Sequence, residues 1–396
     1  MSGTKRTIAV VTSSRADYSH LYWPLRDLAD HPDVDLRLIV MASHHSPAFG
    51  STVKEIEKDG FTIAGRVECL LSSDSDVGMA KTIGIAVQSL ADLLGTMRPD
   101  LLLLIADRYE MLAPASVALA LRIPIAHIEG GETSEGAIDD AVRHALTKMS
   151  HIHFTSTQGA RARVISMGEE PWRVHRAGAP SLDHLRRSKL LSRVELEAKL
   201  GMDLSRKPVL VTYHPVTLRT DTTEEADALF AALEQVEEPV FFCFPNADAG
   251  SYQLMERTQA FLSQRDDGRV FVNLDAVTYW SLLRQVRMLV GNSSSGIMET
   301  ASFALPTVNV GLRQKGRERA KNVLDAAPDT MDILAKIRIA YSDEFRASLA
   351  GMTNPYGDGH AAEFITRVLT QVPLGSELLT KQAVPLPIVL PDETDA

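Results

Sequence analysis

The chain has 396 residues, of which 45% are hydrophobic and 23% charged, so it can form two globular domains with large cores. The formal net charge is −10 and basic residues do not form long runs, which excludes an extended surface for nucleic acid or anionic membrane. The two cysteines, Cys69 and Cys243, are too few for a disulfide framework or a thiolate metal site, which indicates a reducing compartment.

The apolar run near the N-terminus covers only residues 8–11, which is too short for the core of a signal peptide. No other apolar stretch approaches membrane-spanning length. We therefore expect a cytoplasmic protein that binds neither membrane nor nucleic acid.

Short apolar runs alternate along the chain with amphipathic stretches, a pattern typical of strand–helix units that build a parallel sheet. The first predicted strands cover residues 7–12, 36–41, 101–106, 124–128 and 152–155. Leu21, Leu25 and Leu28 mark the buried face of the first helix. A second series of strands covers residues 208–213, 240–244, 270–273, 288–291 and 306–310. The sequence therefore predicts an α/β fold of two facing Rossmann-like domains with a cleft between them.

Domain boundaries follow from composition. The segment 177–180 contains Gly178 and Pro180 and precedes a charged stretch, so we place the first domain at residues 1–180 and the second at 181–375. Residues 376–396 contain Pro385, Pro387 and Pro391 and end in acidic residues, which predicts a Pro-rich tail.

Polar residues follow two strands of the first series. Arg15 and Ser19 lie between the first strand and its helix, where a helix N-terminus with an arginine suits a phosphate. Helix capping by the neighbouring hydroxyls, with a solvated arginine, is the alternative. Asp107 and Arg108 follow the strand at 101–106, where open α/β sheets carry catalytic groups; a local ion pair would explain them equally well.

The segment 127–134 and the following segment 139–144 concentrate glycines, acids, histidines and an arginine directly after an apolar strand. The glycine pair allows the backbone to approach a substrate, and Glu132 follows it. In the next helix Asp140 can reach Arg143 and His144, three and four residues on; an exposed ion pair near a helix N-terminus is the alternative. The helical spacing predicts that Ala145 faces the core and Arg143 does not.

Two classes of cofactor are not expected. His151 and His153 share one face of a strand without an acid or cysteine nearby in the sequence, so we expect no metal site. The glycine patterns of dinucleotide-binding and P-loop proteins are absent from the sequence. We therefore expect no cofactor.

Further polar residues follow strands of the second series. His214 ends one strand, where it suits acid–base work or a phosphate, although a lone histidine there is usually structural. Asn246 and Asp248 end another strand in what could be only a turn. The segment 291–299, with Ser293, Ser294 and Glu299, offers hydroxyls and backbone N–H groups to a diphosphate before a helix that begins near Gly296; serine capping is the alternative. Arginines 313, 317 and 319 follow the next strand and could add positive charge.

Taken together, these motifs resemble those of the hydrolysing UDP-N-acetylglucosamine 2-epimerases of sialic and related nonulosonic acid biosynthesis. The matching segments are 15–19, 107–110, 130–132, 138–140 with 143–145, 212–217, 291–294, 313–314 with 316–317, and 356–359. The resemblance implies a GT-B type fold with the active site in the interdomain cleft and the nucleotide held mainly by the second domain. It also implies anti elimination of UDP to 2-acetamidoglucal, followed by hydration to N-acetylmannosamine.

By resemblance, Asp107, Glu132 and Asp140 carry the proton transfers and His214 assists the departing diphosphate. The expected substrate and nucleotide contacts are Arg15, Ser19, Arg108, Arg143, Asn246, Asp248, Ser293, Ser294, Glu299 and Arg313. The chain departs from the family pattern at Glu129, where many bacterial members have His, and at Asp140, where they have Glu.

The resemblance leaves the sugar open. We expect UDP-N-acetylglucosamine; the alternatives are a UDP- or GDP-linked 2,4-diacetamido-2,4,6-trideoxyhexose, a non-hydrolysing epimerase, and a nucleotide-sugar sensor without catalysis. Retention of the acids and of His214 argues against the sensor. Relatives are commonly dimers or tetramers, so we expect a homodimer or homotetramer.

Overall fold

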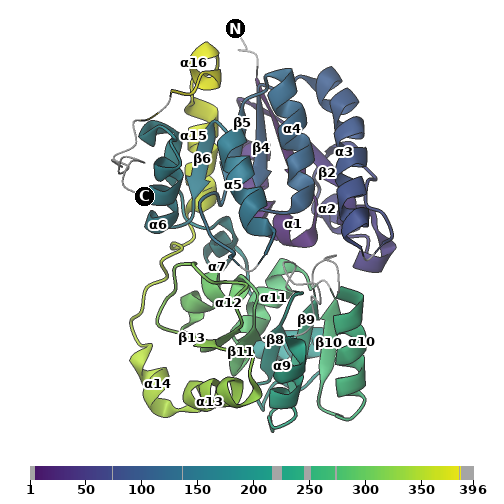
Figure 1. Ribbon diagram of the computed structural model, residues 1–396, viewed down its shortest axis with the longest axis vertical. Coiled ribbons are helices and arrows are strands. Elements are labelled where there is room, and N and C mark those ends of the chain that lie inside the picture. The colour runs from purple at the N-terminus through teal and green to yellow at the C-terminus, as the bar shows by residue number, and fades with distance from the viewer. Residues whose placement is uncertain are drawn as a thin grey trace, which may run out of the picture.

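The computed structural model describes residues 5–73, 75–135, 137–215, 225–244, 251–272, 274–382 and 384. Two lobes are stacked along the long axis of the molecule, and most of the N-terminal half of the chain lies in one of them (Figure 1). Asn246, Asp248 and the prolines expected in the tail lie outside the described residues.

The first sheet is parallel and has the strand order β3-β2-β1-β4-β5-β6-β7. Its strands are β1 (Arg6–Thr12), β2 (Val34–Met41), β3 (Ile63–Val67), β4 (Leu101–Ile105), β5 (Ile125–Ile128), β6 (Ile152–Thr155) and β7 (Val174–Arg176). This is the order of a doubly wound Rossmann sheet: successive strands are added on one side from β1 to β3 and on the other side from β4 onwards, so the switch point lies between β1 and β4. Ligands bind such sheets outside the carboxyl ends of the strands beside that switch point.

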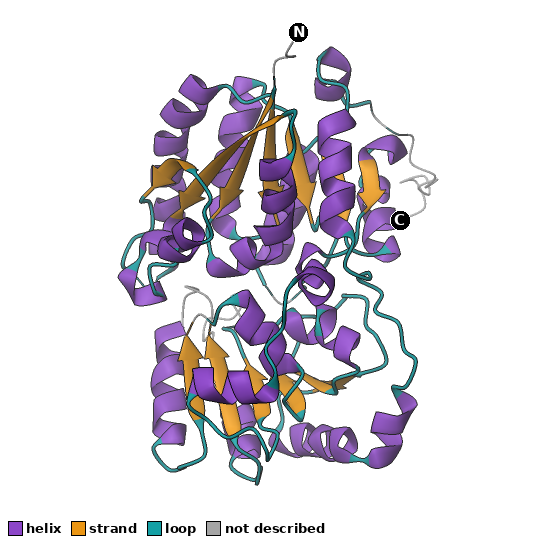
Figure 2. Ribbon diagram, turned by 180° about the vertical axis from the view of Figure 1, so that it is seen from behind, coloured by secondary structure: helices purple, strands orange, loops and turns teal. Residues whose placement is uncertain are grey.

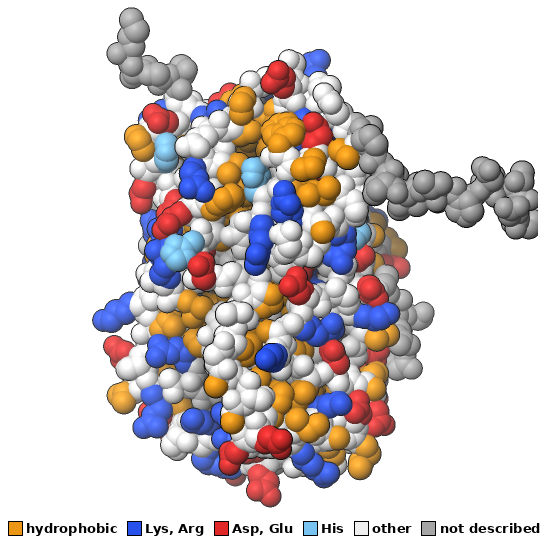
Figure 3. All heavy atoms as spheres, turned by 90° about the vertical axis from the view of Figure 1, so that its left-hand side faces the viewer, with side chains coloured by type: hydrophobic (Ala, Val, Ile, Leu, Met, Phe, Trp, Pro, Cys, Tyr) orange, Lys and Arg blue, Asp and Glu red, His pale blue; other side chains and the backbone are white. Residues whose placement is uncertain are grey.

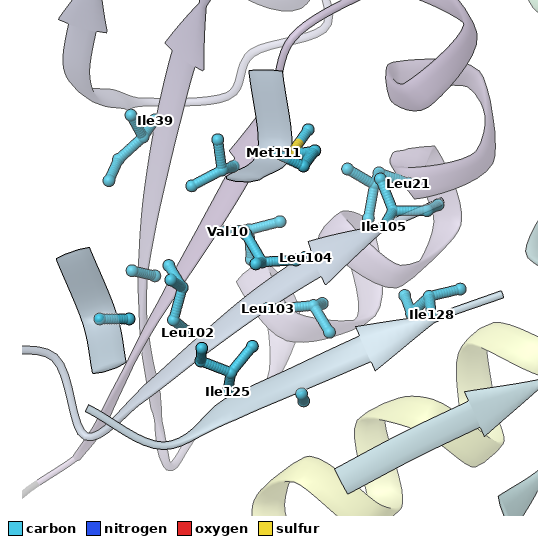
Figure 4. Packing of buried hydrophobic residues seen from close by; sticks show 14 of the residues in the cluster. Val10, Leu21, Ile39, Leu102, Leu103, Leu104, Ile105, Met111, Ile125 and Ile128 are labelled. Atoms are coloured by element: carbon cyan, nitrogen blue, oxygen red, sulfur yellow. The ribbon is translucent and has the colours of Figure 1, made fainter. Parts of the chain in front are cut away.

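Helices cover both faces of this sheet (Figure 2). They are α1 (Arg15–Asp30), α2 (Val53–Lys58), α3 (Asp76–Met97), α4 (Leu112–Leu121), α5 (Asp139–Met149) and α6 (Gln158–Ser166). The strands of β4 and β5 are fully buried, and Figure 4 shows Val10, Leu103 and Ile125 packed in the same cluster. Leu21, Leu25 and Leu28 of α1 are also fully buried, as their spacing predicts.

The second sheet is parallel with the order β10-β9-β8-β11-β12-β13, and its switch point lies between β8 and β11. Its strands are β8 (Val209–Thr212), β9 (Val240–Phe244), β10 (Arg269–Val272), β11 (Met288–Gly291), β12 (Thr307–Val310) and β13 (Val323–Ala326). The helices of this part are α7 (Asp183–Arg187), α8 (Arg193–Leu200), α9 (Ala226–Leu233), α10 (Ser251–Leu262), α11 (Ala276–Leu283), α12 (Ser295–Met298), α13 (Thr330–Tyr341) and α14 (Asp343–Ser348). The predicted pair of Rossmann-like domains is therefore confirmed.

Three strands escape the sequence analysis. They are β3, β7 and β13, each at an edge of its sheet. β3 contains Gly65 and Arg66, β7 has only three residues, and β13 carries Asp325, so none of them forms an apolar run. Edge strands are paired on one side only and often contain charged residues, which weakens their signal in the sequence.

After α14 the chain returns to the first lobe. Helix α15 (Ala361–Gln371) packs against α1, and its Ile365 and Leu369 join the core of the first sheet. Leu378 of α16 (Ser376–Leu379) belongs to the same cluster. Figure 1 shows α15 and α16 in the lobe of the first sheet. Residues 361–375, which the sequence analysis places in the second domain, thus pack on the first.

Among the described residues, one helix, α3, has the length and mean hydropathy of a membrane-spanning segment. The expectation that no stretch approaches membrane-spanning length is therefore wrong for α3. Its Ala86, Leu90 and Leu94 are fully buried in the core of the first sheet, so packing within the domain already accounts for these apolar positions. On the face shown in Figure 3, charged side chains of both signs are mixed with apolar ones.

Candidate active site

A cavity between the two lobes receives loops that follow strands beside both switch points. These loops come after β1, β4, β8 and β11, and carry Arg15, Asp107, His214 and Ser293. The first domain also contributes Ser19, His20, Arg108, Glu129, Ser134 and Asp139 to the cavity wall. The second domain also contributes Tyr279, Ser294, Ser295, Glu299, Arg313 and Arg317. The two Rossmann-like sheets therefore present their ligand-binding edges to one another.

Arg15 follows β1 at the start of α1. Its neighbours Ser14 and Asp17 cap the helix, because Ser14 Oγ accepts from the Asp17 N–H and the Asp17 carboxylate accepts from the Ser14 N–H. The capping alternative is thus correct for these two residues. The Arg15 Nε and Nη1 atoms are buried without a hydrogen-bond partner among the described residues, and burial lowers the pKa of the guanidinium. Arg15 therefore brings unused donors to the cavity.

Asp107 enters the cavity from the end of β4. The preceding Ala106 has φ +57°, a left-handed conformation that is uncommon for residues other than glycine. The Asp107 carboxylate pairs with Arg143 Nη2, and Arg317 Nη2 lies 3.9 Å from the same oxygen. Arg143 is only 1% exposed, so the expectation that it faces away from the core is wrong. Helix α5 buries Arg143 because the guanidinium has a carboxylate to pair with, whereas Ala145 is exposed.

Glu129, rather than Glu132, lines the cavity. Glu129 has φ +65°, a strained conformation of the kind that costs about 1–3 kcal/mol and occurs at functional sites. Its Oε1 lies 2.7 Å from His20 Nδ1. Gly131 has φ +80°, and a Cβ at this position would overlap the Ala160 carbonyl, so the loop turns sharply between the two acids.

Glu132 is 3% exposed and does not line the cavity. Tyr356 Oη donates to its Oε2 at 3.3 Å, and its Oε1 is buried without a partner among the described residues. Burial raises the pKa of Glu132 to about 7, although the Arg317 guanidinium opposes this rise. Glu132 is therefore a buried carboxyl behind the cavity wall, and its expected part in proton transfer stays a prediction.

The two neighbouring acids at the start of α5 also differ in whether they line the cavity. Asp139 lines the cavity, and its Oδ2 lies 3.2 Å from Arg313 Nη2 of the second domain. Asp140 does not line the cavity: its Oδ1 accepts from the Ser134 N–H at 2.7 Å and its Oδ2 lies 3.5 Å from His144 Nε2. Asp140 thus stabilises the loop that leads into the helix, and its expected part in proton transfer stays a prediction.

Arg108 also reaches the cavity. Its Nη2 lies 3.0 Å from Glu110 Oε1, and its Nε donates to Glu110 Oε2 at 3.2 Å. Burial raises the pKa of Glu110, and the charge of Arg108 opposes that rise. The local ion pair that the sequence analysis kept as an alternative is therefore present, next to a cavity that Arg108 also lines.

His214 is held by the loop after β11. The Asn292 side chain accepts from the His214 N–H at 2.7 Å and donates to the His214 carbonyl at 2.9 Å. Arg313 Nη1 donates to the Asn292 carbonyl at 3.2 Å. Gly291 has φ +144°, and a Cβ there would overlap the Thr212 carbonyl, so only glycine lets the two loops approach this closely. His214 is thus placed by two strand ends at once.

The serine loop continues into the short helix α12. Ser293 and Ser294 line the cavity directly before it. Ser295 Oγ donates to Glu299 Oε2 at 2.5 Å and lies 2.6 Å from Tyr279 Oη. The helix begins at Ser295, one residue before the expected position.

Contacts between the lobes close one side of the cavity. Arg317 Nε donates to the Thr133 carbonyl at 2.9 Å, and its Nη2 donates to Ser134 Oγ at 3.3 Å. Lys315 Nζ lies 2.9 Å from Glu135 Oε2. The loop between β5 and α5 is thereby fastened to the loop after β12.

Some cavity residues are missing from the predicted site. Glu129 and Asp139 lie inside the predicted motifs, so the motifs identified the loop but not which acids line the cavity. His20 follows Ser19 by one residue and adjoins a predicted contact. Tyr279 on α11 has no signal in the sequence, because nothing local distinguishes it from a core aromatic residue.

The two histidines of β6 have other partners. His153 Nε2 lies 3.2 Å from Glu169 Oε2, and His151 Nδ1 accepts from the Ile125 N–H at 3.1 Å. In the part of the chain that the structure describes, no group of three His, Cys, Asp or Glu side chains is placed to hold a metal ion.

The chain matches a family profile described as UDP-N-acetylglucosamine 2-epimerase over residues 26–370. It is 36% identical over 332 residues to a Campylobacter jejuni GDP/UDP-N,N'-diacetylbacillosamine 2-epimerase (hydrolyzing), covering 83% of this chain and 86% of the relative. It is also 36% identical over 377 residues to the Legionella pneumophila UDP-N,N'-diacetylbacillosamine 2-epimerase (hydrolyzing), covering 95% of this chain and 98% of that protein.

Its fold is similar to that of a solved UDP-GlcNAc 2-epimerase from Neisseria meningitidis bound to UDP-GlcNAc. The TM-score is 0.78 at 18% identity, and the match covers 92% of this chain and 99% of the other. The expected GT-B type architecture is therefore confirmed.

Proposed function

The chain belongs to the UDP-N-acetylglucosamine 2-epimerase family and is an enzyme of the hydrolysing nucleotide-sugar 2-epimerase class, and we propose that its substrate is a UDP-linked 2,4-diacetamido-2,4,6-trideoxyhexose. The products are UDP and the free 2-epimeric sugar. The sequence analysis gives this sugar as an alternative to the expected UDP-N-acetylglucosamine. Its support over UDP-N-acetylglucosamine is the 36% identity to two hydrolysing diacetylbacillosamine 2-epimerases, one of which matches over nearly the whole chain.

One observation carries the chemical part of the proposal. Carboxylates of the first domain, Asp107, Glu129 and Asp139, line the same cavity as the hydroxyls of Ser293 and Ser294 in the second. The acids suit proton transfer at the sugar, and a serine-rich loop after a strand suits a diphosphate. A nucleotide sugar that spans the cleft would meet both sets at once.

In the first step a base removes the proton from C2 while the C1–O bond to UDP breaks. The electron pair forms the C1–C2 double bond of a glycal, and UDP leaves with the bonding pair. We assign the proton transfers to Asp107, Glu129 and Asp139, which line the cavity. Burial alone would raise the pKa of Glu129, but the adjacent His20 outweighs burial and lowers it. Glu129 is therefore ionised at neutral pH and can accept a proton.

Negative charge builds on the departing diphosphate and must be stabilised before the bond breaks. Arg15 has two buried nitrogen atoms without partners in the described part of the chain, so it can donate without breaking an existing bond. Ser293, Ser294 and Arg313 lie on the second-domain side of the cavity, together with His214. We assign these residues to the diphosphate, with Glu299 on the nucleotide.

In the second step water adds at C1 and a proton is delivered to C2 on the face opposite to its loss. The sugar leaves as a hemiacetal inverted at C2, and the balance is nucleotide sugar plus water to UDP plus free sugar. The two steps are redox-neutral overall. Because the proton is lost and delivered on opposite faces of C2, one cavity acid removes it and another supplies the new one.

Proton NMR in D2O tests this assignment. The purified protein is incubated separately with UDP-N,N'-diacetylbacillosamine and with UDP-N-acetylglucosamine, and kcat/KM is compared. We expect free UDP and a C2-deuterated 2-epimer, with the diacetamido substrate turned over faster. Preference for UDP-N-acetylglucosamine would contradict the proposed sugar, and a 2-epimer still linked to UDP would contradict hydrolysis.

A variant separates catalysis from binding. Asp107→Asn preserves the shape of the side chain and is expected to lower kcat by about 10²- to 10⁴-fold, the contribution typical of general acid–base catalysis. UDP affinity, measured by calorimetry, is expected to stay within a few-fold. Glu344→Gln on the exposed surface of α14 is the matched control. An active Asp107→Asn enzyme would remove this residue from the mechanism.

A further inference from the structure

His20 lies between carboxylates of the two domains. Its Nδ1 is 2.7 Å from Glu129 Oε1, at the end of β5 in the first domain. Its Nε2 is 3.7 Å from Glu299 Oε1, directly after α12 in the second domain. All three side chains line the cavity, and each is less than one-fifth exposed. The imidazole thus faces one carboxylate from each lobe.

The backbone holds Glu129 in place for this contact. The residue has φ +65°, where a side chain other than that of glycine, asparagine or aspartate is uncommon. Such strain persists only where the surrounding structure imposes it. The left-handed turn comes directly after β5, and the carboxylate that it carries contacts His20 rather than solvent.

The other partners are equally constrained. Glu299 Oε2 accepts from Ser295 Oγ, which also contacts Tyr279 Oη, so Oε1 is the oxygen that faces His20. On the helix side, the carbonyl of Ser19 accepts from His184 Nε2 at 3.0 Å, which fastens the first turns of α1 to α7. The imidazole is therefore placed by a capped helix and not by a loose loop.

We propose that His20 is a positioning residue for this reaction: its imidazole ties Glu129 of the first domain to Glu299 of the second. It thereby sets the distance between the proton-transfer groups of the first domain and the nucleotide-binding residues of the second. This inference rests on the proposed function for the roles of the two acids. It adds a residue that the motifs do not identify and that need not touch the reacting atoms.

The charges around His20 agree with this role. The titratable groups facing it are Asp17 on its own helix, Glu129 after β5, Glu299 after α12 and His184 on α7. Burial lowers the pKa of His20, but Glu129, Glu299 and Asp17 outweigh burial and raise it to about 9. The ring is therefore an imidazolium at neutral pH, hydrogen-bonded to Glu129 through Nδ1 and with Nε2 at ion-pair distance from Glu299. The link is present below pH 9 and is lost as the pH rises through that value.

The test is His20→Gln, which removes the charge and keeps one donor. We expect UDP dissociation constants and the KM of the nucleotide sugar to rise by about tenfold, within the range of coupling between contacting charged groups. Deuterium is still expected at C2 of the product, because the proton-transfer groups remain. The alkaline loss of wild-type UDP affinity near pH 9 should be absent from the variant. His31→Gln, near the other end of α1, is the matched control.

A double-mutant cycle makes the result independent of the choice of sugar. His20→Gln and Glu299→Gln should be less than additive in UDP affinity, since either one breaks the same link. Full additivity, or UDP affinity within twofold of wild type in His20→Gln, would overturn the proposal. If His20→Gln does not fold, two other measurements decide. The proposal is also overturned if wild-type UDP affinity does not change with pH and Glu299→Gln binds UDP as tightly as wild type. If neither sugar is turned over but His20 and Glu299 are still coupled in UDP affinity, the proposed function is refuted and the role of His20 is not.

Discussion

Glu132→Gln is expected to make the protein more stable at alkaline pH. The carboxyl is 3% exposed, and one of its oxygens is buried without a partner among the described residues. Burial raises its pKa from the ordinary 4.5 to about 7, with Arg317 opposing and Glu129 adding to the rise. Ionising this group in the folded protein is therefore unfavourable.

The magnitude follows from linkage. The folded state binds the Glu132 proton more tightly than the unfolded state, so this stabilisation is complete below pH 4.5 and is lost as the pH rises through about 7. At about 1.4 kcal/mol per pKa unit, the difference between 4.5 and 7 corresponds to about 3 kcal/mol. Glutamine keeps an acceptor for Tyr356 and cannot ionise. Its advantage over glutamate should be about 1 kcal/mol at pH 5 and reach about 3 kcal/mol at pH 8.5.

Urea denaturation from pH 5 to 8.5 measures this difference. Tryptophan fluorescence is a suitable probe, because Trp23 and Trp172 lie in the first domain with Glu132. Comparing variant with wild type at each pH cancels the other titrating groups. Glu344→Gln, an exposed substitution, should give a flat difference. If Glu132→Gln destabilises the protein equally at pH 5 and pH 8.5, the carboxylate is ionised in the folded state and the reasoning is refuted.

Three further outcomes are expected. Arg143→Met leaves Asp107 without its buried partner and should cost about 3–5 kcal/mol in urea denaturation, with kcat reduced at least about 100-fold. Gly131→Ala should lower the melting temperature more than Gly168→Ala does. Both positions have positive φ, but of these two only Gly131 is placed so that a Cβ would overlap backbone atoms. Equal losses of melting temperature would contradict the predicted clash. Ser293→Ala should raise the KM of the nucleotide sugar about tenfold, as expected for a hydrogen bond to a charged group, while exposed Ser263→Ala should not change it.

Much of the fold could be predicted from local pattern. The central strands β1, β4, β8 and β11 are apolar because helices bury both faces of a parallel sheet, and such runs are visible in any single sequence. The edge strands lack that signal. The sequence also carries no signal that α15 returns to the first domain, since the amphipathic face of this helix would fit either sheet. The expected homodimer or homotetramer stays a prediction.

The sequence by itself determined which loops meet at the cavity, because polar residues that follow apolar strands must gather at the carboxyl edge of a parallel sheet. Arg15, Asp107, His214 and Ser293 were predictable on that ground. Only the tertiary structure decided which of two neighbouring acids faces the cavity. That choice depends on backbone dihedral angles and on partners from distant segments: Glu129 turns towards His20, whereas Glu132 is buried against Tyr356. Such partners are far apart in the chain, and only folding brings them into contact.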